Sequence, residues 1–186
     1  MWFSVQMNSQ RVRYTYDLSG IVQGVGFRPA VLRLAKNTGL NGWIQNRTDS
    51  VRLVLEGLID EVTAFIPILQ KNLPLNAKIT NITLIESMEI SEKEKTDKFS
   101  ILPSFLTNVT SLLIPADLSM CPDCLAEIRN PDDRRYNYPF TTCINCGPRY
   151  TIINATPYDR ERTTMASFPM CEDCRREYEN PEDRRF

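Results

Sequence analysis

Apolar and polar residues alternate along several short segments in the first hundred positions, and this pattern predicts β-strands. Residues 11–19 (RVRYTYDLS) place Val12, Tyr14, Tyr16 and Leu18 between polar neighbours, which is typical of a half-buried strand. Four further segments have strand character: 41–47, 51–56, 78–85 and 99–102. The first two of these are separated only by a short polar turn, which predicts a hairpin.

Two stretches between the strands have helical spacing. One helix is predicted to begin at Pro29, a residue tolerated in the first turn, and to end at Gly39. A second helix is predicted over residues 59–73, broken by Pro67. The resulting order is strand, helix, strand, strand, helix, strand. It predicts an α+β fold of the ferredoxin-like βαββαβ type, an antiparallel sheet with two helices on one face.

The chain divides into three parts on this pattern. Residues 1–103 are predicted to form the sheet-and-helix domain, and residues 104–120 show no clear period, so they are predicted to be a connector. Residues 121–186 contain all the cysteines and are predicted to form a separate zinc-finger region.

Composition excludes several classes of function. The 186 residues include 22 basic and 23 acidic side chains, so no overall field favours nucleic acid or an anionic membrane. The sequence has neither a signal-peptide pattern at its start nor an apolar run of about 18 residues, which predicts a cytoplasmic protein. It contains no histidine, so histidine cannot serve as a general base or zinc ligand.

The six cysteines form three C-x-x-C pairs: Cys121 and Cys124, Cys143 and Cys146, and Cys171 and Cys174. In a reducing compartment such clustering favours a metal over disulfides. Eighteen residues separate the first pair from the second, a spacing typical of a four-cysteine zinc site. Four thiolates complete the coordination shell, which predicts one structural zinc.

An internal repeat explains the third pair. Residues 121–136 (CPDCLAEIRNPDDRRY) and 171–186 (CEDCRREYENPEDRRF) are identical at nine of 16 positions, at a constant offset of 50. The same offset would place a closing pair after residue 186. Cys171 and Cys174 are therefore predicted to be half of a second zinc site, which indicates a piece of a larger protein.

A glycine-rich segment lies between the first predicted strand and helix. In GIVQGVGFR, residues 20–28, the close glycines allow a sharp turn that directs backbone N–H groups into one concavity. The helix N-terminus beyond it favours an anion, and Arg28 offers a guanidinium fork for phosphate oxygens. A solvated arginine beside an ordinary turn is the alternative reading of this pattern.

This segment, together with GWIQN at residues 42–46, resembles the acylphosphatase family. The resemblance covers about residues 11–103 and implies the same six-element fold. It implies that Arg28 and the backbone of Gln23, Gly24, Val25, Gly26 and Phe27 bind phosphate, and that Asn46 orients the attacking water. An acyl phosphate is already activated, so holding its charge and placing a water are the main demands.

The combination with CPDC, CINCGPRYTI and NPDDRRY resembles the N-terminal part of the HypF carbamoyltransferases that mature nickel-iron hydrogenases. That family releases carbamate from carbamoyl phosphate, activates it with ATP in later domains and passes the carbamoyl group to the C-terminal cysteine of a maturation partner. The carbamoyl group is the precursor of the metal's cyanide ligands. The later domains are not in this sequence, so the resemblance implies carbamoyl phosphate hydrolysis without complete transfer.

Two alternatives stay open on the sequence. The chain could be a stand-alone acylphosphatase with an accessory zinc module. It could also be a zinc-ribbon protein that binds nucleic acid, although the ten arginines from Cys121 onward are mixed with 12 acidic residues.

Overall fold

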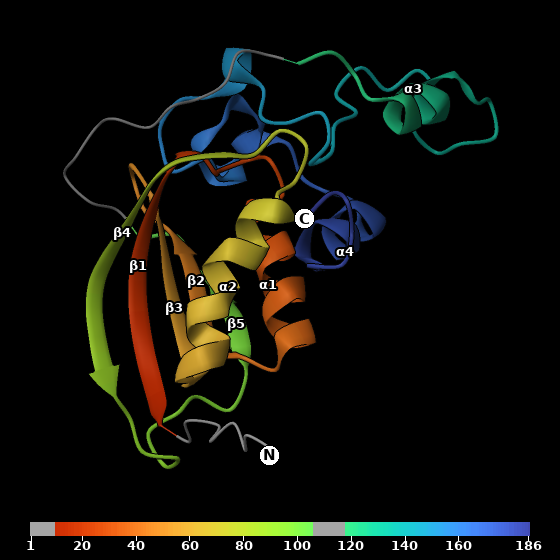
Figure 1. Cartoon of the computed structure of the whole chain (residues 1–186). Coiled ribbons are helices and arrows are strands. Elements are labelled where there is room, and N and C mark those ends of the chain that lie inside the picture. Colours follow the sequence, from red (N-terminus) through yellow and green to blue (C-terminus); the bar gives the residue numbers. More distant parts are fainter. Residues whose placement is uncertain (1–9, 106–117) are drawn as a thin grey trace.

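A five-stranded sheet with both of its helices on one face forms the first part of the molecule (Figure 1). The computed structural model describes residues 10–105 and 118–186. The elements of this part are β1 (Arg11–Ile21), α1 (Phe27–Thr38), β2 (Asn41–Asn46), β3 (Val51–Leu58), α2 (Ile59–Lys71), β4 (Lys78–Glu89) and β5 (Phe99–Leu102). The predicted α+β fold is confirmed.

The strand order is β4-β1-β3-β2-β5, and one pairing differs from the sequence prediction. The pairs β1–β3, β1–β4 and β2–β3 are antiparallel, as expected. However, β5 pairs with β2 in parallel, so the prediction of a wholly antiparallel sheet is wrong at this edge. The reason is that β1 to β4 already complete the βαββαβ unit, and the chain then returns to add a fifth strand beside β2.

The core lies between the sheet and the two helices. Val12 and Leu18 of β1 are buried there with residues of α2 at helical spacing: Val62, Phe65 and Leu69. Two helix boundaries differ from the prediction. Helix α1 begins at Phe27, two residues before Pro29, and α2 continues through Pro67 to Lys71 because the proline lies on the exposed side.

The cysteine region, residues 121–186, has little regular structure. It contains two eight-residue helices, α3 (Pro122–Arg129) and α4 (Glu172–Glu179), and three 3-10 turns, Tyr150–Ile152, Arg160–Arg162 and Thr164–Ser167. Both α helices start directly after a cysteine and end before an asparagine. The sequence repeat is therefore a repeat of local structure. Most of the predicted connector, residues 106–117, lies outside the described residues.

The two parts of the chain contact each other around the start of α1. The backbone N–H of Tyr158 donates a hydrogen bond of 3.1 Å to the Gln23 side chain, and Asn76 Nδ2 donates one of 2.7 Å to the Asn145 carbonyl. In the described ranges, no helix combines the length and apolar character needed to cross a bilayer.

Candidate active site and metal centre

The glycine loop, residues 20–26, turns the chain from β1 into α1 with two left-handed residues. Gly24 and Gly26 have φ angles of 70° and 72°, which residues with a Cβ rarely adopt. Gly26 is also the N-cap of α1 and supplies no side-chain cap to the first turn. The loop therefore combines a sharp turn with a helix N-terminus, the arrangement that suits an anion.

Gln23 fixes the loop to the turn between β2 and β3. This side chain is only 4% exposed, and its amide nitrogen donates to the carbonyls of Arg47, at 2.6 Å, and Ser50, at 3.1 Å. These acceptors lie on either side of the turn that directly follows Asn46. The glycine loop is thus held next to the end of β2, where the sequence predicted the second active-site residue.

The cysteine region covers the glycine loop, a contact that the sequence did not reveal. A Cβ at Gly24 would lie 2.9 Å from atoms of both Pro148 and Tyr158, and a Cβ at Gly26 would lie 2.9 Å from Ile144. Contacts this short leave no room for a methyl group. The glycines therefore serve close packing between the two parts of the chain as well as the loop conformation.

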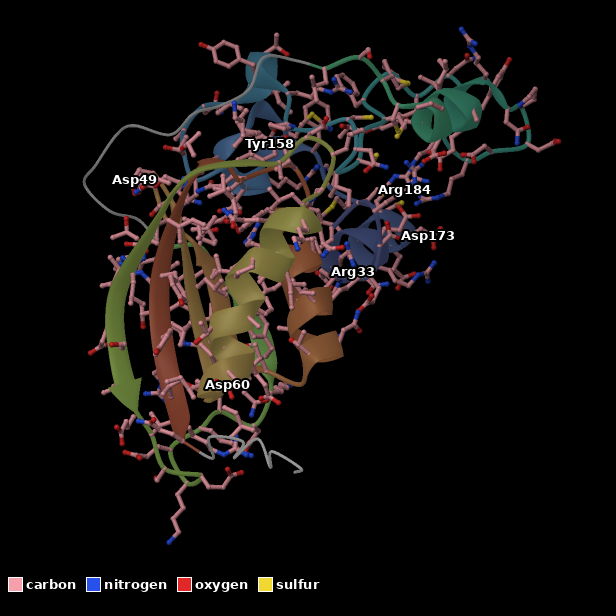
Figure 2. All side chains as sticks on the ribbon, viewed as in Figure 1. Arg33, Asp49, Asp60, Tyr158, Asp173 and Arg184 are labelled. Atoms are coloured by element: carbon pink, nitrogen blue, oxygen red, sulfur yellow. The ribbon has the colours of Figure 1, made fainter. Side chains whose placement is uncertain are left out.

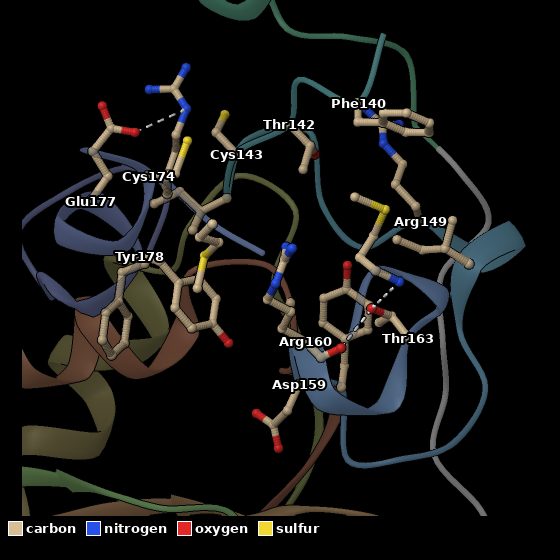
Figure 3. A pocket seen from close by; sticks show the side chains of 18 of the residues that line it. Phe140, Thr142, Cys143, Arg149, Asp159, Arg160, Thr163, Cys174, Glu177 and Tyr178 are labelled. Atoms are coloured by element: carbon tan, nitrogen blue, oxygen red, sulfur yellow. Dashed lines mark hydrogen bonds and ion pairs between the residues drawn. The ribbon is translucent and has the colours of Figure 1, made fainter. Parts of the chain in front are cut away.

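Arg28 reaches into a cavity of about 1300 Å³ between the loop and the cysteine region. Its guanidinium lies 3.6 Å from Asp159, whose other carboxylate oxygen is 3.2 Å from Arg162. Figure 3 shows Asp159 and Arg160 on the wall contributed by the cysteine region. Burial lowers the pKa of Arg28, and the Asp159 carboxylate partly offsets this. The cation is thus poorly solvated and paired with a carboxylate.

Asn46 is a fully buried amide without a protein partner. Its side chain is 0% exposed, and neither its oxygen nor its nitrogen has a hydrogen-bond partner in the described parts of the chain. Its backbone is firmly held, since the Asn46 carbonyl accepts a 2.8 Å hydrogen bond from Phe105. An unsatisfied buried amide costs about 1–3 kcal/mol, so a ligand or water that pairs with it would recover stability.

The structure brings most of the predicted phosphate-binding residues together, but not all. The cavity is lined by Gly24, Gly26, Phe27 and Arg28. Gln23, Val25 and Asn46 are not among the lining residues, and Asn46 is the last residue of β2, directly before the β2–β3 turn. Sequence reasoning missed Asp159, Arg162 and Tyr158, because they are more than 100 positions away and belong to no motif in the chain.

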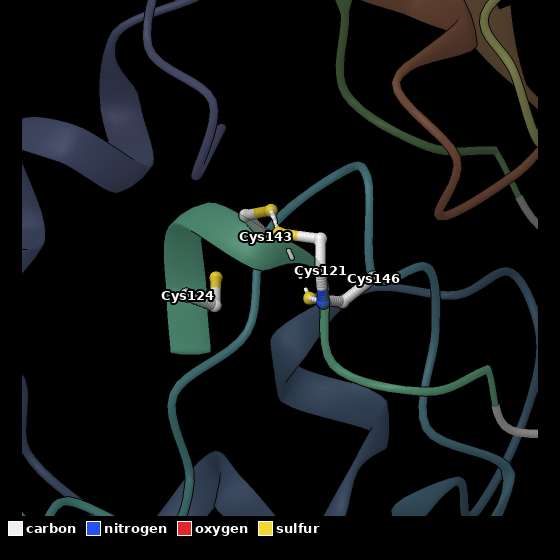
Figure 4. Close-up of side chains that lie close together, drawn as sticks. All are labelled: Cys121, Cys124, Cys143 and Cys146. Carbon is white, nitrogen blue, oxygen red and sulfur yellow. Dashed lines mark hydrogen bonds between the residues drawn. The ribbon is translucent and has the colours of Figure 1, made fainter. Parts of the chain in front are cut away.

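The first module, residues 121–146, brings its four cysteines to one point (Figure 4). The sulfurs of Cys121, Cys124, Cys143 and Cys146 all lie within 4.8 Å of one another. All four are free thiols, and three are buried. Among the described residues, this group has the arrangement of a metal site.

The spacing of these sulfurs fits a zinc ion. The Sγ atoms of Cys121 and Cys143 are 3.6 Å apart, and those of Cys143 and Cys146 are 3.9 Å apart. Tetrahedral coordination with Zn–S bonds of about 2.3 Å implies sulfur separations of about 3.8 Å. These separations exceed a disulfide bond of about 2.05 Å, so the geometry favours a metal over oxidation.

Hydrogen-bond donors surround the sulfurs. The backbone N–H of Cys121 donates to Cys146 Sγ at 3.3 Å, and Arg184 Nη1 lies 3.2 Å from Cys124 Sγ. Burial raises the pKa of the Cys121 thiol, but hydrogen bonds involving Cys124, Cys146 and Cys143 outweigh it and lower that pKa to about 7. Burial raises the pKa of the Cys124 and Cys143 thiols, so of these shifts it is that of Cys121 that favours the thiolate form a metal requires.

The second module, residues 171–186, presents Cys171 and Cys174 at the start of α4. Cys171 is exposed and Cys174 is partly exposed, in contrast to the buried sulfurs of the first module. Within residues 10–105 and 118–186 they join no cluster of metal-ligand type. Their assignment to a second zinc site stays a prediction.

Comparison with known proteins identifies both parts of the chain. Residues 14–101 match the acylphosphatase family, and residues 120–153 and 170–186 match the HypF finger. An acylphosphatase from Bacillus licheniformis is 35% identical over 85 residues, which are 45% of this chain and 93% of that protein. This match covers nearly a whole enzyme.

Larger proteins match both parts together. A carbamoyltransferase HypF from Synechocystis is 47% identical over 152 residues, which cover 82% of this chain and 19% of that protein. A crystal structure of full-length HypF in the phosphate- and nucleotide-bound form aligns with a TM-score of 0.81 at 41% identity, covering 95% of this chain and 23% of that chain. The sequence thus spans about a fifth of the length of these relatives.

Proposed function

Because the chain belongs to the acylphosphatase family through residues 14–101 and carries the HypF finger, we propose that it hydrolyses carbamoyl phosphate. The observation that carries this proposal is the glycine loop with Arg28 at the cavity between the loop and the cysteine region. A substrate of this class needs an anion site, a cation and a placed water, and no side-chain nucleophile.

Each residue has a defined task in the proposed reaction. The N–H groups of the loop and the Arg28 guanidinium hold the phosphate oxygens and stabilise their charge as the acyl–phosphate bond breaks. The Asn46 amide orients the water, which supplies a hydroxyl to one product and a proton to the other. The products are carbamate and inorganic phosphate.

Phosphate release tests the proposal directly. The protein is expected to release phosphate from carbamoyl phosphate and from acetyl phosphate, since the two share the acyl–phosphate bond. The spontaneous decomposition of each compound, measured without protein, is the blank. Folded protein that releases no phosphate above this blank from either compound would exclude the hydrolytic function.

Asn46→Leu is expected to separate activity from stability. The substitution removes an amide that has no hydrogen-bond partner, so the free energy of unfolding should stay equal or rise by about 1 kcal/mol. Hydrolysis should fall about 100-fold, because misplacing the water costs about that much. The measurements are thermal unfolding and phosphate release. A variant that unfolds earlier and keeps its activity would contradict the role of Asn46.

Asp159→Asn is expected to strengthen binding of inorganic phosphate. The carboxylate lies 3.6 Å from Arg28, where it competes with and repels an anion. Removing one such charge should contribute about 1–2 kcal/mol, or roughly 5- to 30-fold in the inhibition constant for phosphate. Asp60→Asn is the matched control, because Figure 2 shows Asp60 at the far end of the first region from Tyr158. Equal inhibition constants for wild type and Asp159→Asn would contradict the competition.

The cysteine region is proposed to hold zinc at Cys121, Cys124, Cys143 and Cys146. The metal would replace a hydrophobic core in a segment that has almost none, since its buried cluster consists of cysteines. Its role is structural, because four thiolates leave no open coordination position. The folded region can then cover the glycine loop.

The family resemblance extends the proposal to a pathway. Carbamate produced here would be passed to ATP-dependent domains, and then to a C-terminal cysteine of a hydrogenase maturation partner. The end product would be the cyanide ligand of the nickel-iron centre. Support comes from the HypF carbamoyltransferases that cover 82–87% of this chain.

Neither alternative is favoured by a specific contact. An accessory zinc module would not need to pack against both glycines of the loop. A nucleic-acid surface needs free arginines, yet most arginines of the cysteine region are paired with carboxylates, namely Arg134, Arg135, Arg162, Arg176, Arg184 and Arg185.

A further inference from the structure

In the cysteine region, an arginine of each module contacts cysteine sulfurs of the other module. Arg184 of the second module donates to Cys124 Sγ of the first at 3.2 Å. Fifty positions earlier, Arg134 of the first module lies 3.4 Å from Cys174 Sγ and 3.7 Å from Cys171 Sγ of the second. Equivalent residues of the repeat thus make equivalent contacts in opposite directions.

A glutamate of each module likewise forms ion pairs with arginines of the other module. Glu127 of the first module pairs with Arg184 and Arg185 of the second. Its counterpart Glu177 pairs with Arg134, at 2.8 Å, and Arg135 of the first. Arg184 and Arg134 are therefore each bound at once to a carboxylate and to sulfur of the opposite module. Figure 3 shows Glu177 and Cys174 close together on the wall of the cavity.

The same local turn precedes the last arginine of each module. In the first module, the Asp133 side chain accepts a 2.8 Å hydrogen bond from the backbone N–H of Arg135. In the second module, Asp183 accepts one of 2.8 Å from Arg185 in the same way. A backbone hydrogen bond also links the two modules, since the Ile144 N–H donates to the Arg184 carbonyl at 2.9 Å. Ile144 lies between the second pair of cysteines, so Arg184 contacts both halves of the first metal site.

We infer that Arg184 and Arg134 are positioning residues, each of which stabilises the thiolates of the opposite module, and so the metal they bind, by direct contact with sulfur. Four thiolates around Zn²⁺ carry a net charge of −2, and a guanidinium beside a buried sulfur compensates part of it. Donors outside the ligand shell typically change metal affinity 10- to 100-fold.

Arg134 and Arg184 contact sulfurs of different modules, so their substitution has different expected effects. Arg134 lies within the first module, between its two cysteine pairs, yet it contacts only sulfurs of the second. Arg184 lies outside the first module and contacts its Cys124. Arg184→Ala should therefore weaken metal binding at the first site, and Arg134→Ala should not.

Metal retention of the purified chain tests this without any enzyme assay. Zinc competition with a chromophoric chelator is expected to show 10- to 100-fold weaker binding for Arg184→Ala, with partial rescue in Arg184→Lys, which keeps the charge. Cobalt loading should shift the thiolate charge-transfer band in Arg184→Ala only. Arg175→Ala, an exposed arginine on α4, is the matched control.

Two outcomes would overturn the inference. Wild-type zinc affinity and an unchanged cobalt spectrum in Arg184→Ala would show that the sulfur contact is without effect. Equal losses in Arg184→Ala and Arg134→Ala would show that breaking the ion-pair network merely destabilises the region.

Discussion

Arg28→Ala is expected to reduce hydrolysis of carbamoyl phosphate by about 100- to 1000-fold, the usual effect of removing one charge-stabilising group from a transition state. The guanidinium is the cavity-lining cation next to the glycine loop and is already largely desolvated. In such a site the charge interaction is stronger than in water. The loss should therefore appear in kcat as well as in KM.

The measurement is phosphate release under single-turnover and steady-state conditions. Arg33→Ala is the matched control, because Arg33 is on the same helix and does not line the cavity (Figure 2). Arg28→Lys should recover only part of the activity, since lysine keeps the charge but cannot grip two oxygens with a planar fork. Unchanged activity in a correctly folded Arg28→Ala variant would remove Arg28 from the mechanism.

Cys124→Ser is expected to unfold the cysteine region while leaving the sheet domain intact. Cys124 is fully buried among the sulfurs, and a structural zinc contributes about 10–16 kcal/mol of apparent binding free energy. The region has no apolar core to replace that contribution. The sheet and its two helices have their own core and should keep their unfolding transition.

Metal analysis, limited proteolysis and thermal unfolding check this outcome together. The variant should lose its zinc, be cleaved within residues 118–186 and retain a protected fragment that contains residues 10–105. Cys171→Ser is the control, because Cys171 is exposed and belongs to no complete cluster among the described residues. Retention of zinc and of protease resistance in Cys124→Ser would contradict a structural metal at this site.

Local periodicity explains why most of the fold could be predicted from the sequence. The strand over residues 11–19 and the helix over residues 59–73 follow from which positions are apolar, and both lie in the structure close to the predicted bounds. The parallel pairing of β5 could not be read this way, because four residues carry no information about which neighbour they pair with. The prediction that Pro67 breaks the second helix was wrong, because a proline on an exposed helix face costs one hydrogen bond and does not end the helix.

The amino-acid sequence by itself determined the strand and helix order, the glycine loop with Arg28, the four-cysteine spacing and the repeat. The first three depend on residues close together in the chain, and the repeat is a direct match between two segments 50 positions apart. Only the tertiary structure decided that the cysteine region covers the loop, that Asp159 faces Arg28, and that Arg184 contacts Cys124. These contacts join residues 60 or more positions apart, and such pairs are selected by packing and charge complementarity after the elements have formed.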